Sequence, residues 1–351
     1  MNLNDILVKS VNEGVSDIFI VAGLPVSVRK NGSIVNISPE RIMPSETRNL
    51  LSQIYEAADN RDLSLLETNG DDDFSFSIPG LSRFRVSAYK QRGALSAVIR
   101  VITFTLPNPA ELGIPDNIVQ IGNSHNGMIL VTGAAGSGKS TTLACIVDYI
   151  NHNYNKHIIT LEDPIEHLHR HNKSIVSQRE LGVDTESYVK ALRASLRQSP
   201  DVILLGEMRD YETISVAMTA AETGHMVLSS LHTMGAANTI DRIIDVFPPD
   251  QQRQIAVQLS TVLSAVISQQ LVPAIDGSVV PAFEIMTVTP AIRNMIRENK
   301  TPQIDAQLYS ANRPDMKSMD QSLIELYNNG IITRETALQY ATNAELISRK
   351  L

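Results

Sequence analysis

The most informative residues of this chain form a glycine-rich run that suits the phosphates of a nucleotide: Gly133, Ala134, Ala135, Gly136, Ser137, Gly138, Lys139, Ser140 and Thr141. The first eight match the pattern G-x-x-x-x-G-K-[ST], in which glycines let backbone N–H groups turn toward phosphate oxygens. In this pattern the lysine reaches the β- and γ-phosphates and the serine hydroxyl binds Mg²⁺. No guanine-reading Asn-Lys-x-Asp tetrapeptide occurs in the sequence, which favours ATP over GTP. The nine residues therefore predict a site for ATP and Mg²⁺.

Carboxylates follow a second apolar run of the sequence. Glu162, Asp163 and Glu166 cluster around Pro164, which ends strand pairing after residues 157–161. In an open α/β sheet, ligands bind beyond the carboxyl ends of the strands. These acids are therefore candidates for the nucleotide site, whereas the simpler interpretation is a group of solvated acids at a strand end.

A third apolar run, residues 201–205, ends in Gly206 and Glu207. An apolar strand that delivers a carboxylate beside a phosphate loop is the Walker B arrangement, which holds Mg²⁺ or its water. We therefore expect Ser140 to be a direct magnesium ligand and Glu207 to act through a water molecule.

Two histidines bracket a fourth apolar run, residues 226–231. His225 enters this predicted strand, and His232 leaves it at the edge where the phosphates are expected. His232 is a candidate sensor of the γ-phosphate or a link to the next subunit, although a histidine that only caps the strand fits equally well. Three more histidines alternate in a way that would place them on one strand face: His167, His169 and His171. We expect a polar, partly solvated edge there and not a metal site.

A basic stripe occupies an earlier part of the chain. Every charged residue from position 83 to position 100 is basic, and the stripe consists of Arg83, Arg85, Lys90, Arg92 and Arg100. One hypothesis is a site for an external anion, including nucleic acid. Another is that these arginines face the nucleotide of a neighbouring subunit and act as arginine fingers. A solvated pair of charged strands remains the third interpretation.

The elements that must position these residues fall into two parts with different patterns. Up to residue 105 the periodicity predicts helices over 2–14 and 44–57, together with strands over 17–21, 26–29, 33–37, 74–78, 81–89 and 95–103. This mixture predicts a sheet with flanking helices. Residues 106–115 are rich in proline and glycine, and we place the linker there.

Buried strands alternate with helices after the linker. The predicted strands are residues 127–132, 157–161, 201–205 and 226–231, and a helix over 141–150 follows the glycine-rich run. This alternation predicts a mainly parallel sheet covered on both faces, within a core of residues 116–288. Residues 289–351 are predicted to form short helices, over 290–299, 318–328 and 333–340.

Composition excludes several classes of protein. The 351 residues carry 30 Lys and Arg against 38 Asp and Glu, a formal net charge of −8, which is unfavourable for a general nucleic-acid binder. The single Cys145 excludes an intramolecular disulfide and a multi-cysteine zinc module. No apolar run is long enough for a membrane span, and the first fourteen residues do not have the pattern of a secretory signal.

Several of these motifs together resemble the secretion ATPases of type II secretion and type IV pilus systems. Residues 160–166 are similar to the Asp box of that family, and residues 206–210 and 219–225 are similar to its Walker B motif and the start of its His box. Residues 231–233 and 239–248 continue the similarity. Residues 291–298, AIRNMIRE, resemble a motif typical of the retraction ATPases within the family.

The resemblance implies an α/β protein with a PAS-like α+β N-terminal domain, a RecA-like P-loop ATPase domain and a helical C-terminal region. It also implies a cytoplasmic homohexamer that is peripheral to the inner membrane, docks on the pilus platform protein, and uses ATP and Mg²⁺ to power pilus retraction. Glu166 would be the general base, Glu207 the Walker B acid, and His225 and His232 the His-box residues. Arg83, Arg85, Arg92 and Arg100 would contact nucleotide in the neighbouring subunit.

Departures from the family pattern keep alternatives open. Met234 and Gly235 replace the polar pair that usually follows His-Thr, and Phe19 stands where a histidine is often found. A pilus assembly or type II secretion ATPase and an accessory retraction paralogue are alternatives on the same fold. From other classes, we consider a DNA-translocating motor, which the acidic charge disfavours, and a nucleotide-dependent scaffold that does not hydrolyse ATP.

Overall fold

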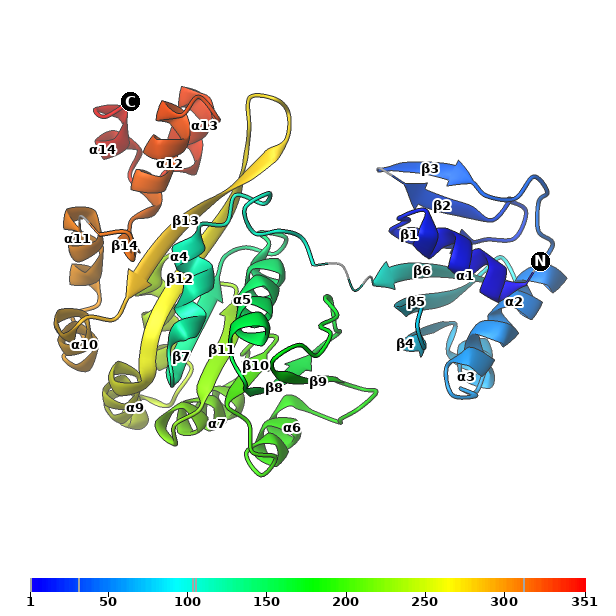
Figure 1. The fold of residues 1–351 in the computed structure, drawn as a ribbon, viewed down its shortest axis with the longest axis horizontal. Coiled ribbons are helices and arrows are strands. Elements are labelled where there is room, and N and C mark those ends of the chain that lie inside the picture. Colours follow the sequence, from blue (N-terminus) through cyan, green and yellow to red (C-terminus); the bar gives the residue numbers. More distant parts are fainter. Residues whose placement is uncertain (1, 31, 103, 105, 312) are drawn as a thin grey trace. The chain divides into compact units, whose positions relative to one another are not determined.

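The computed structural model is an α/β protein made of two compact units (Figure 1). It describes residues 2–30, 32–102, 104, 106–311 and 313–351. The first unit comprises residues 1–105 and the second comprises residues 106–351. Each unit has its own sheet and its own apolar core, so each is described separately.

The first unit packs three helices against one face of an antiparallel sheet. The helices are α1 (Leu3–Asn12), α2 (Pro44–Ala57) and α3 (Ser64–Asn69). The strands are β1 (Asp17–Ile20), β2 (Ser27–Lys30), β3 (Ser33–Asn36), β4 (Asp71–Ile78), β5 (Ser82–Gln91) and β6 (Ala94–Ile102), in the order β3-β2-β1-β6-β5-β4. Leu7, Ile54 and Phe84 are among the fully buried residues between the helices and the sheet.

Local sequence explains most of this unit. Helix α2 has the predicted bounds because Pro44 occupies its first turn and the Glu46 carboxylate accepts a hydrogen bond from the Met43 N–H at 2.7 Å. Helix α3 was not predicted, since it is short and buries only Leu66. Strand β4 begins at Asp71, earlier than predicted, because Asp72 is neutralised there by Arg61 at 2.7 Å.

The second unit contains an eight-stranded sheet. Its strands are β7 (Gly127–Thr132), β8 (His157–Glu162), β9 (Ile175–Glu180), β10 (Val202–Leu205), β11 (Met226–Leu231), β12 (Leu263–Pro273), β13 (Val279–Thr287) and β14 (Met316–Lys317), in the order β14-β13-β12-β7-β11-β10-β8-β9. The six strands from β12 to β9 in this order are parallel, and β13 and β14 are antiparallel to their neighbours. The mainly parallel sheet was predicted correctly.

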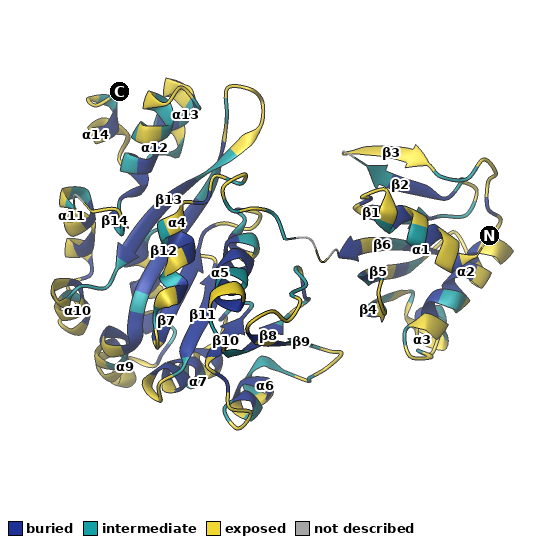
Figure 2. Cartoon of the chain, viewed as in Figure 1, coloured by how far each residue is buried: buried dark blue, intermediate teal, exposed yellow. Residues whose placement is uncertain are grey.

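Helices cover both faces of this sheet, which explains why its central strands β7, β10 and β11 are buried along their whole length (Figure 2). One core cluster includes residues of α4 (Asp116–Val119) and α5 (Lys139–Asn153). The 3₁₀ helix η1 (Gln120–Asn123) follows directly after α4. The opposite cluster draws on α6 (Tyr188–Ser195), α7 (Tyr211–Glu222), α8 (Ala236–Asp245) and α9 (Pro249–Val262).

The C-terminal part combines short helices with one strand of the core sheet. The helices are α10 (Pro290–Arg297), α11 (Pro302–Ser310), α12 (Met319–Asn328), α13 (Arg334–Tyr340) and α14 (Ala344–Ser348). Buried Asp320 joins them, because its carboxylate accepts hydrogen bonds from the N–H groups of Thr342 and Asn343 at 2.7 and 3.1 Å. Within the described ranges, no helix combines the length and apolar character that crossing a bilayer requires.

The strand predicted for the alternating histidines was wrong. His167, His169 and His171 lie in the irregular segment between β8 and β9. The segment folds back on β9, where the His169 N–H donates to the Gln178 side chain at 2.8 Å and His171 Nδ1 accepts from the Val176 N–H at 3.0 Å. These bonds to side chains and to a neighbouring strand take the place of regular strand pairing.

Candidate nucleotide site

The glycine-rich run forms a tight loop between β7 and α5. Gly136 and Gly138 have φ values of +76° and +87°, in the region that favours glycine. Gly133 is constrained by space as well, because a Cβ there would lie 2.3 Å from the Gln269 carbonyl oxygen. The loop therefore needs glycine at these positions to expose its backbone N–H groups at the start of α5, where the helix dipole favours an anion.

Lys139 lies inside the loop. Its Nζ donates hydrogen bonds to the carbonyl oxygens of Gly133 and Ala134 at 3.0 and 2.8 Å, and the residue is 7% exposed. Burial lowers the pKa of the Lys139 ammonium, while the charges of Glu207 and Glu166 act to raise it. The two carboxylates therefore lie close enough to hold a positive charge at the point where phosphates would approach.

A chain of contacts joins the phosphate loop to the end of β10. Lys139 Nζ lies 3.4 Å from His232 Nδ1, and His232 Nε2 lies 3.4 Å from Glu207 Oε2. Because Lys139 is a donor, this geometry suits a neutral imidazole that accepts at Nδ1 and donates from Nε2 to Glu207. On its other side, Glu207 Oε1 lies 2.6 Å from Arg209 Nη2. His232 thus connects the phosphate loop to Glu207.

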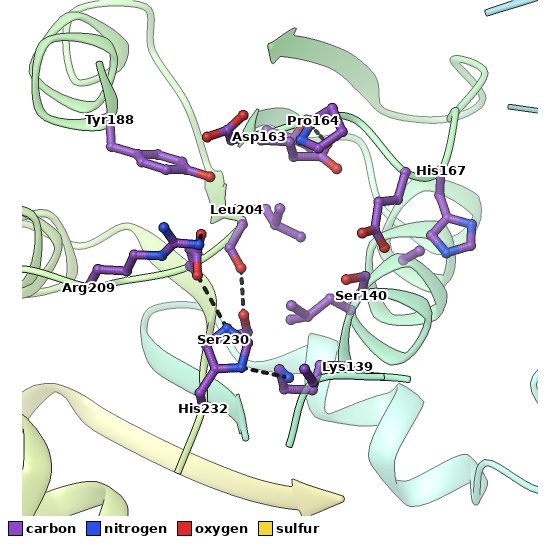
Figure 3. Close-up of a pocket in the computed structure, with 18 of the residues that line it drawn as sticks. Lys139, Ser140, Asp163, Pro164, His167, Tyr188, Leu204, Arg209, Ser230 and His232 are labelled. Carbon is purple, nitrogen blue, oxygen red and sulfur yellow. Dashed lines mark hydrogen bonds and ion pairs between the residues drawn. The ribbon is translucent and has the colours of Figure 1, made fainter. Parts of the chain in front are cut away.

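The carboxyl ends of β8, β10 and β11 meet the loop around a cavity of about 290 Å³ (Figure 3). Tyr188 and Arg209 lie on the side of this pocket opposite His167 and Ser140. The lining includes Lys139, Ser140, Glu162, Asp163, Glu166, His169, Glu207 and His232. The strand ends are held together by Ser230, whose hydroxyl donates to the Gly206 carbonyl at 2.6 Å.

The acids around Pro164 have two different environments. Glu162 is half-buried, accepts a hydrogen bond from the Thr160 hydroxyl at 2.6 Å, and has its pKa raised by burial to about 7. Glu166 and Asp163 are exposed. Next to them, His167 Nε2 lies 3.3 Å from the Thr141 hydroxyl of the phosphate loop, and burial lowers the pKa of His167. Burial in the cavity therefore favours the protonated form of the Glu162 carboxyl.

The site fits a nucleotide with Mg²⁺. The Ser137 hydroxyl oxygen in the loop is buried without a hydrogen-bond partner within the described part of the chain, and phosphate oxygens would satisfy it. Among the described residues no three Asp, Glu, His or Cys side chains converge as a metal cage. Magnesium is normally held by few protein ligands together with substrate phosphates. The Ser140 hydroxyl and the Glu207 carboxylate both line the cavity and would suit that mode of binding.

A family model described as type II/IV secretion system protein matches residues 1–313. The chain belongs to this family. It is 42% identical over 341 residues to the type IV pilus retraction ATPase PilT of Pseudomonas aeruginosa. The aligned region covers 97% of this chain and 98% of that protein. It is 44% identical over 322 residues to a twitching motility protein of Neisseria gonorrhoeae, with 92% and 85% covered. The sequence resemblance to secretion ATPases is thus confirmed.

A solved structure of the same family matches the whole fold. This chain has a TM-score of 0.90 and 43% identity to a crystal structure of the pilus retraction motor PilT with bound ADP, with 99% of each chain covered. The α/β fold class of this type II/IV secretion system protein is therefore shown by its relatives as well as by its own sheet order.

The two predicted His-box residues lie at opposite ends of β11. His232 lies in the cavity, whereas His225 is at the start of the strand, where its Nδ1 lies 2.9 Å from the Ala220 carbonyl oxygen and 3.2 Å from the Thr223 hydroxyl. His225 is not part of the lining of the cavity in its own subunit. The structure therefore brings His232 together with the loop and does not bring His225 there.

The predicted basic residues of this type II/IV secretion system protein belong to the first unit. Arg85 on β5 lies directly across from Arg100 on β6, and Asp17 on β1 lies across from Arg100 on the other side. Asp17 Oδ1 is 3.1 Å from Arg100 Nε, and Asp17 Oδ2 is 3.5 Å from Arg29 Nε. Arg85, Arg100, Asp17 and Arg29 form a row across the sheet, called here the arginine row, in which the guanidinium groups of Arg29 and Arg100 share the Asp17 carboxylate.

The other two predicted arginines lie beside this row or at its edge. Arg83 is two residues before Arg85 on β5, and its Nη1 donates to the Ser77 hydroxyl at 3.2 Å. Arg92 occupies the β5–β6 turn with a φ of +48° and is exposed.

Tyr188 and Arg209 line the cavity and were not predicted by the sequence analysis. Tyr188 is the first residue of α6. Its hydroxyl lies close to Gly206, since a Cβ built on that glycine would be 3.0 Å from the hydroxyl oxygen. Arg209 follows Glu207 by two residues and pairs with it. The position of Arg209 beside the Walker B acid was a usable signal, but nothing in the local pattern around Tyr188 indicated the cavity.

Proposed function

We propose that this protein is a ring-forming, magnesium-dependent ATPase that powers retraction of type IV pili. The observation that carries this proposal is the chain of contacts from Lys139 through His232 to Glu207, which joins a phosphate loop to a Walker B acid. The match to a retraction ATPase over 97% of the chain supports the coupling of this site to a pilus machine.

The architecture supports the finer assignments of the fold. An antiparallel six-stranded sheet with three helices supports a PAS-like first unit, and a mainly parallel sheet with a glycine-rich loop after β7 supports a RecA-like second unit. We propose a homohexamer, because the arginine row lies in the first unit and an ATPase of this kind uses arginines to stabilise transferred phosphate. In the proposed assembly these arginines serve the site of a neighbouring subunit.

Each residue of the cavity has a distinct role in the proposed reaction. Lys139 and the loop N–H groups bind the β- and γ-phosphates and stabilise the charge that develops on them. Ser140 and Glu207 would hold Mg²⁺, which supplies charge neutralisation when bound. His232 would sense the γ-phosphate, since it contacts both Lys139 and Glu207.

Two carboxylates are candidates for the base that prepares the attacking water. Glu166 is the base implied by the family resemblance, and it is exposed in the cavity. Glu162 is the second candidate, because it also lines the cavity, a general base works best when its pKa is near the working pH, and burial raises the pKa of Glu162 to about 7.

Replacing Glu162 by glutamine is expected to reduce ATP turnover by about 10²-fold. Burial keeps the Glu162 carboxyl protonated below its raised pKa, so wild-type turnover is expected to fall as the pH decreases through about 7. The measurement is phosphate release between pH 5.5 and 8.5 for the wild type and for Glu162→Gln and Glu166→Gln. A loss confined to Glu166→Gln would return the role of base to Glu166.

The proposed partners follow from the same assignment. We propose that the ring is cytoplasmic and peripheral to the inner membrane, where it would act on the membrane-embedded platform protein of the pilus. Nucleic acid is not a proposed partner, because the chain carries a net charge of −8.

The decisive test is a count of pili on cells whose own gene carries Lys139→Ala. Pili are expected to be abundant and to extend without retracting, because the variant loses the buried ammonium that binds phosphate. Fluorescently labelled pili followed over time measure both extension and retraction. Lys190→Ala is a suitable control, since Lys190 is exposed and pairs among the described ion pairs only with Glu186, which lies just before helix α6.

Other outcomes of this test would reassign the protein. Bald cells would indicate an assembly ATPase. Unchanged pili would indicate a secretion ATPase or an accessory retraction paralogue.

A further inference from the structure

Strand β12, the neighbour of β7 in the sheet, lies against the phosphate loop. Strand β12 pairs with β7 as far as Ser268, which lies across from Thr132, and the next residue is Gln269. Gln269 is 3% exposed, and its Oε1 accepts a hydrogen bond from the Thr142 hydroxyl at 2.7 Å. Thr142 is fully buried in the first turn of α5. A buried amide from β12 is thus bonded to the helix that begins in the loop.

Gln269 also contacts both ends of the loop itself. A Cβ on Gly133 would be 2.3 Å from the Gln269 carbonyl oxygen, and a Cβ on Gly138 would be 2.9 Å from Gln269 Nε2. The backbone and the side chain of one residue therefore fill the space beneath the first and the last glycine of the loop. Neither the predicted nucleotide ligands nor the cavity lining includes Gln269.

The residues on either side of Gln269 bind other elements of the second unit. The Ser268 hydroxyl accepts a hydrogen bond from the Gly235 N–H at 2.9 Å, in the loop that follows His232. The Gln270 side chain donates to the Tyr340 carbonyl at the end of α13, at 3.5 Å. Successive side chains of a strand point to opposite faces, so Gln269 alone of the three faces the phosphate loop and α5.

We propose that Gln269 is a positioning residue of the nucleotide site, which holds the phosphate loop in its binding conformation through Thr142 and through contact with Gly133 and Gly138. The inference rests on the proposed ATPase function. Without the Gln269 amide, the buried Thr142 hydroxyl loses its acceptor. The loop also loses the side chain that holds it at a fixed distance from β12. The N–H groups of the loop would then no longer be pre-arranged around phosphate.

The test compares ADP affinity, measured by calorimetry, in the full-length wild type and in Gln269→Met and Thr142→Val. Each variant keeps its side-chain volume nearly unchanged and removes one end of the same hydrogen bond. Each is expected to bind ADP about tenfold more weakly, and the double variant is expected to be no weaker than the singles, because both act through one bond. If Gln269→Met fails to fold, the ADP affinity of Thr142→Val tests the same hydrogen bond from its other end.

Gln270→Met is the matched control, since it removes an equivalent amide from the same strand on the opposite face. Its ADP affinity is expected to remain within about twofold of the wild type, because no contact to the loop is lost. Equal weakening in the Gln270 and Gln269 variants would show a general loosening of β12 and overturn the proposal. So would normal ADP affinity in Gln269→Met and Thr142→Val. A wild-type protein that binds no ADP would instead refute the proposed ATPase function on which the inference rests.

Discussion

The Glu207→Gln variant is expected to lose ATP turnover by about 10²- to 10³-fold while it still binds ATP. The amide keeps the shape of the side chain, but it removes the negative charge that faces Lys139, His232 and Arg209. Glu207 is 14% exposed at its side chain, so water does not replace that charge effectively. Phosphate release measures turnover, and binding of a fluorescent ATP analogue measures occupancy.

Glu212→Gln is the matched control for this variant. Glu212 lies in the first turn of α7, and its side chain is 49% exposed and pairs with Arg193. Its removal is expected to leave turnover unchanged. Near-normal turnover in a folded Glu207→Gln protein, checked by circular dichroism, would contradict the assignment of Glu207 as the Walker B acid.

The Arg85→Ala variant is expected to lower turnover by about 10³-fold, and only in the assembled ring. Arg85 is exposed and lies directly across from Arg100, whose guanidinium is already held by Asp17. Two guanidinium groups placed side by side repel each other unless an anion lies between them. An anion supplied by a neighbouring subunit would satisfy this arrangement, and a bound nucleotide is such an anion.

Mixed rings separate action on a neighbouring subunit from action within one subunit. When inactive Arg85→Ala and inactive Glu207→Gln subunits are mixed in equal amounts and assemble at random, about a quarter of the sites combine an intact Glu207 with an intact Arg85 from the neighbour. The ATP turnover of the mixed rings should then recover toward about a quarter of the wild-type rate. Mixed rings as inactive as either parent would contradict the neighbouring-subunit role. Arg41→Ala, an exposed arginine outside the strands of the first unit, is the control.

The sequence by itself predicted which segments would meet at one edge of the sheet. The glycine-rich loop, the acids after β8 and β10, and His232 after β11 line one cavity, because each follows a parallel strand and such strands place their carboxyl ends at one edge. The chemical roles of these residues stay predictions. The lengths of α2, β7 and β11 were also predicted correctly, since proline, glycine and unbroken apolar runs mark their ends locally.

Only the tertiary structure decided how the site is supported and which nearby residues share it. Gln269 and Thr142 are 127 positions apart, and they meet because β12 inserts beside β7 in the sheet. Tyr188 reaches the cavity from α6, and Arg85 meets Arg100 through the β5–β6 register. His225 and His232 belong to one motif but lie at opposite ends of β11. Local patterns record what each segment forms, whereas strand order and register, set by packing of the whole core, decide which distant side chains come into contact.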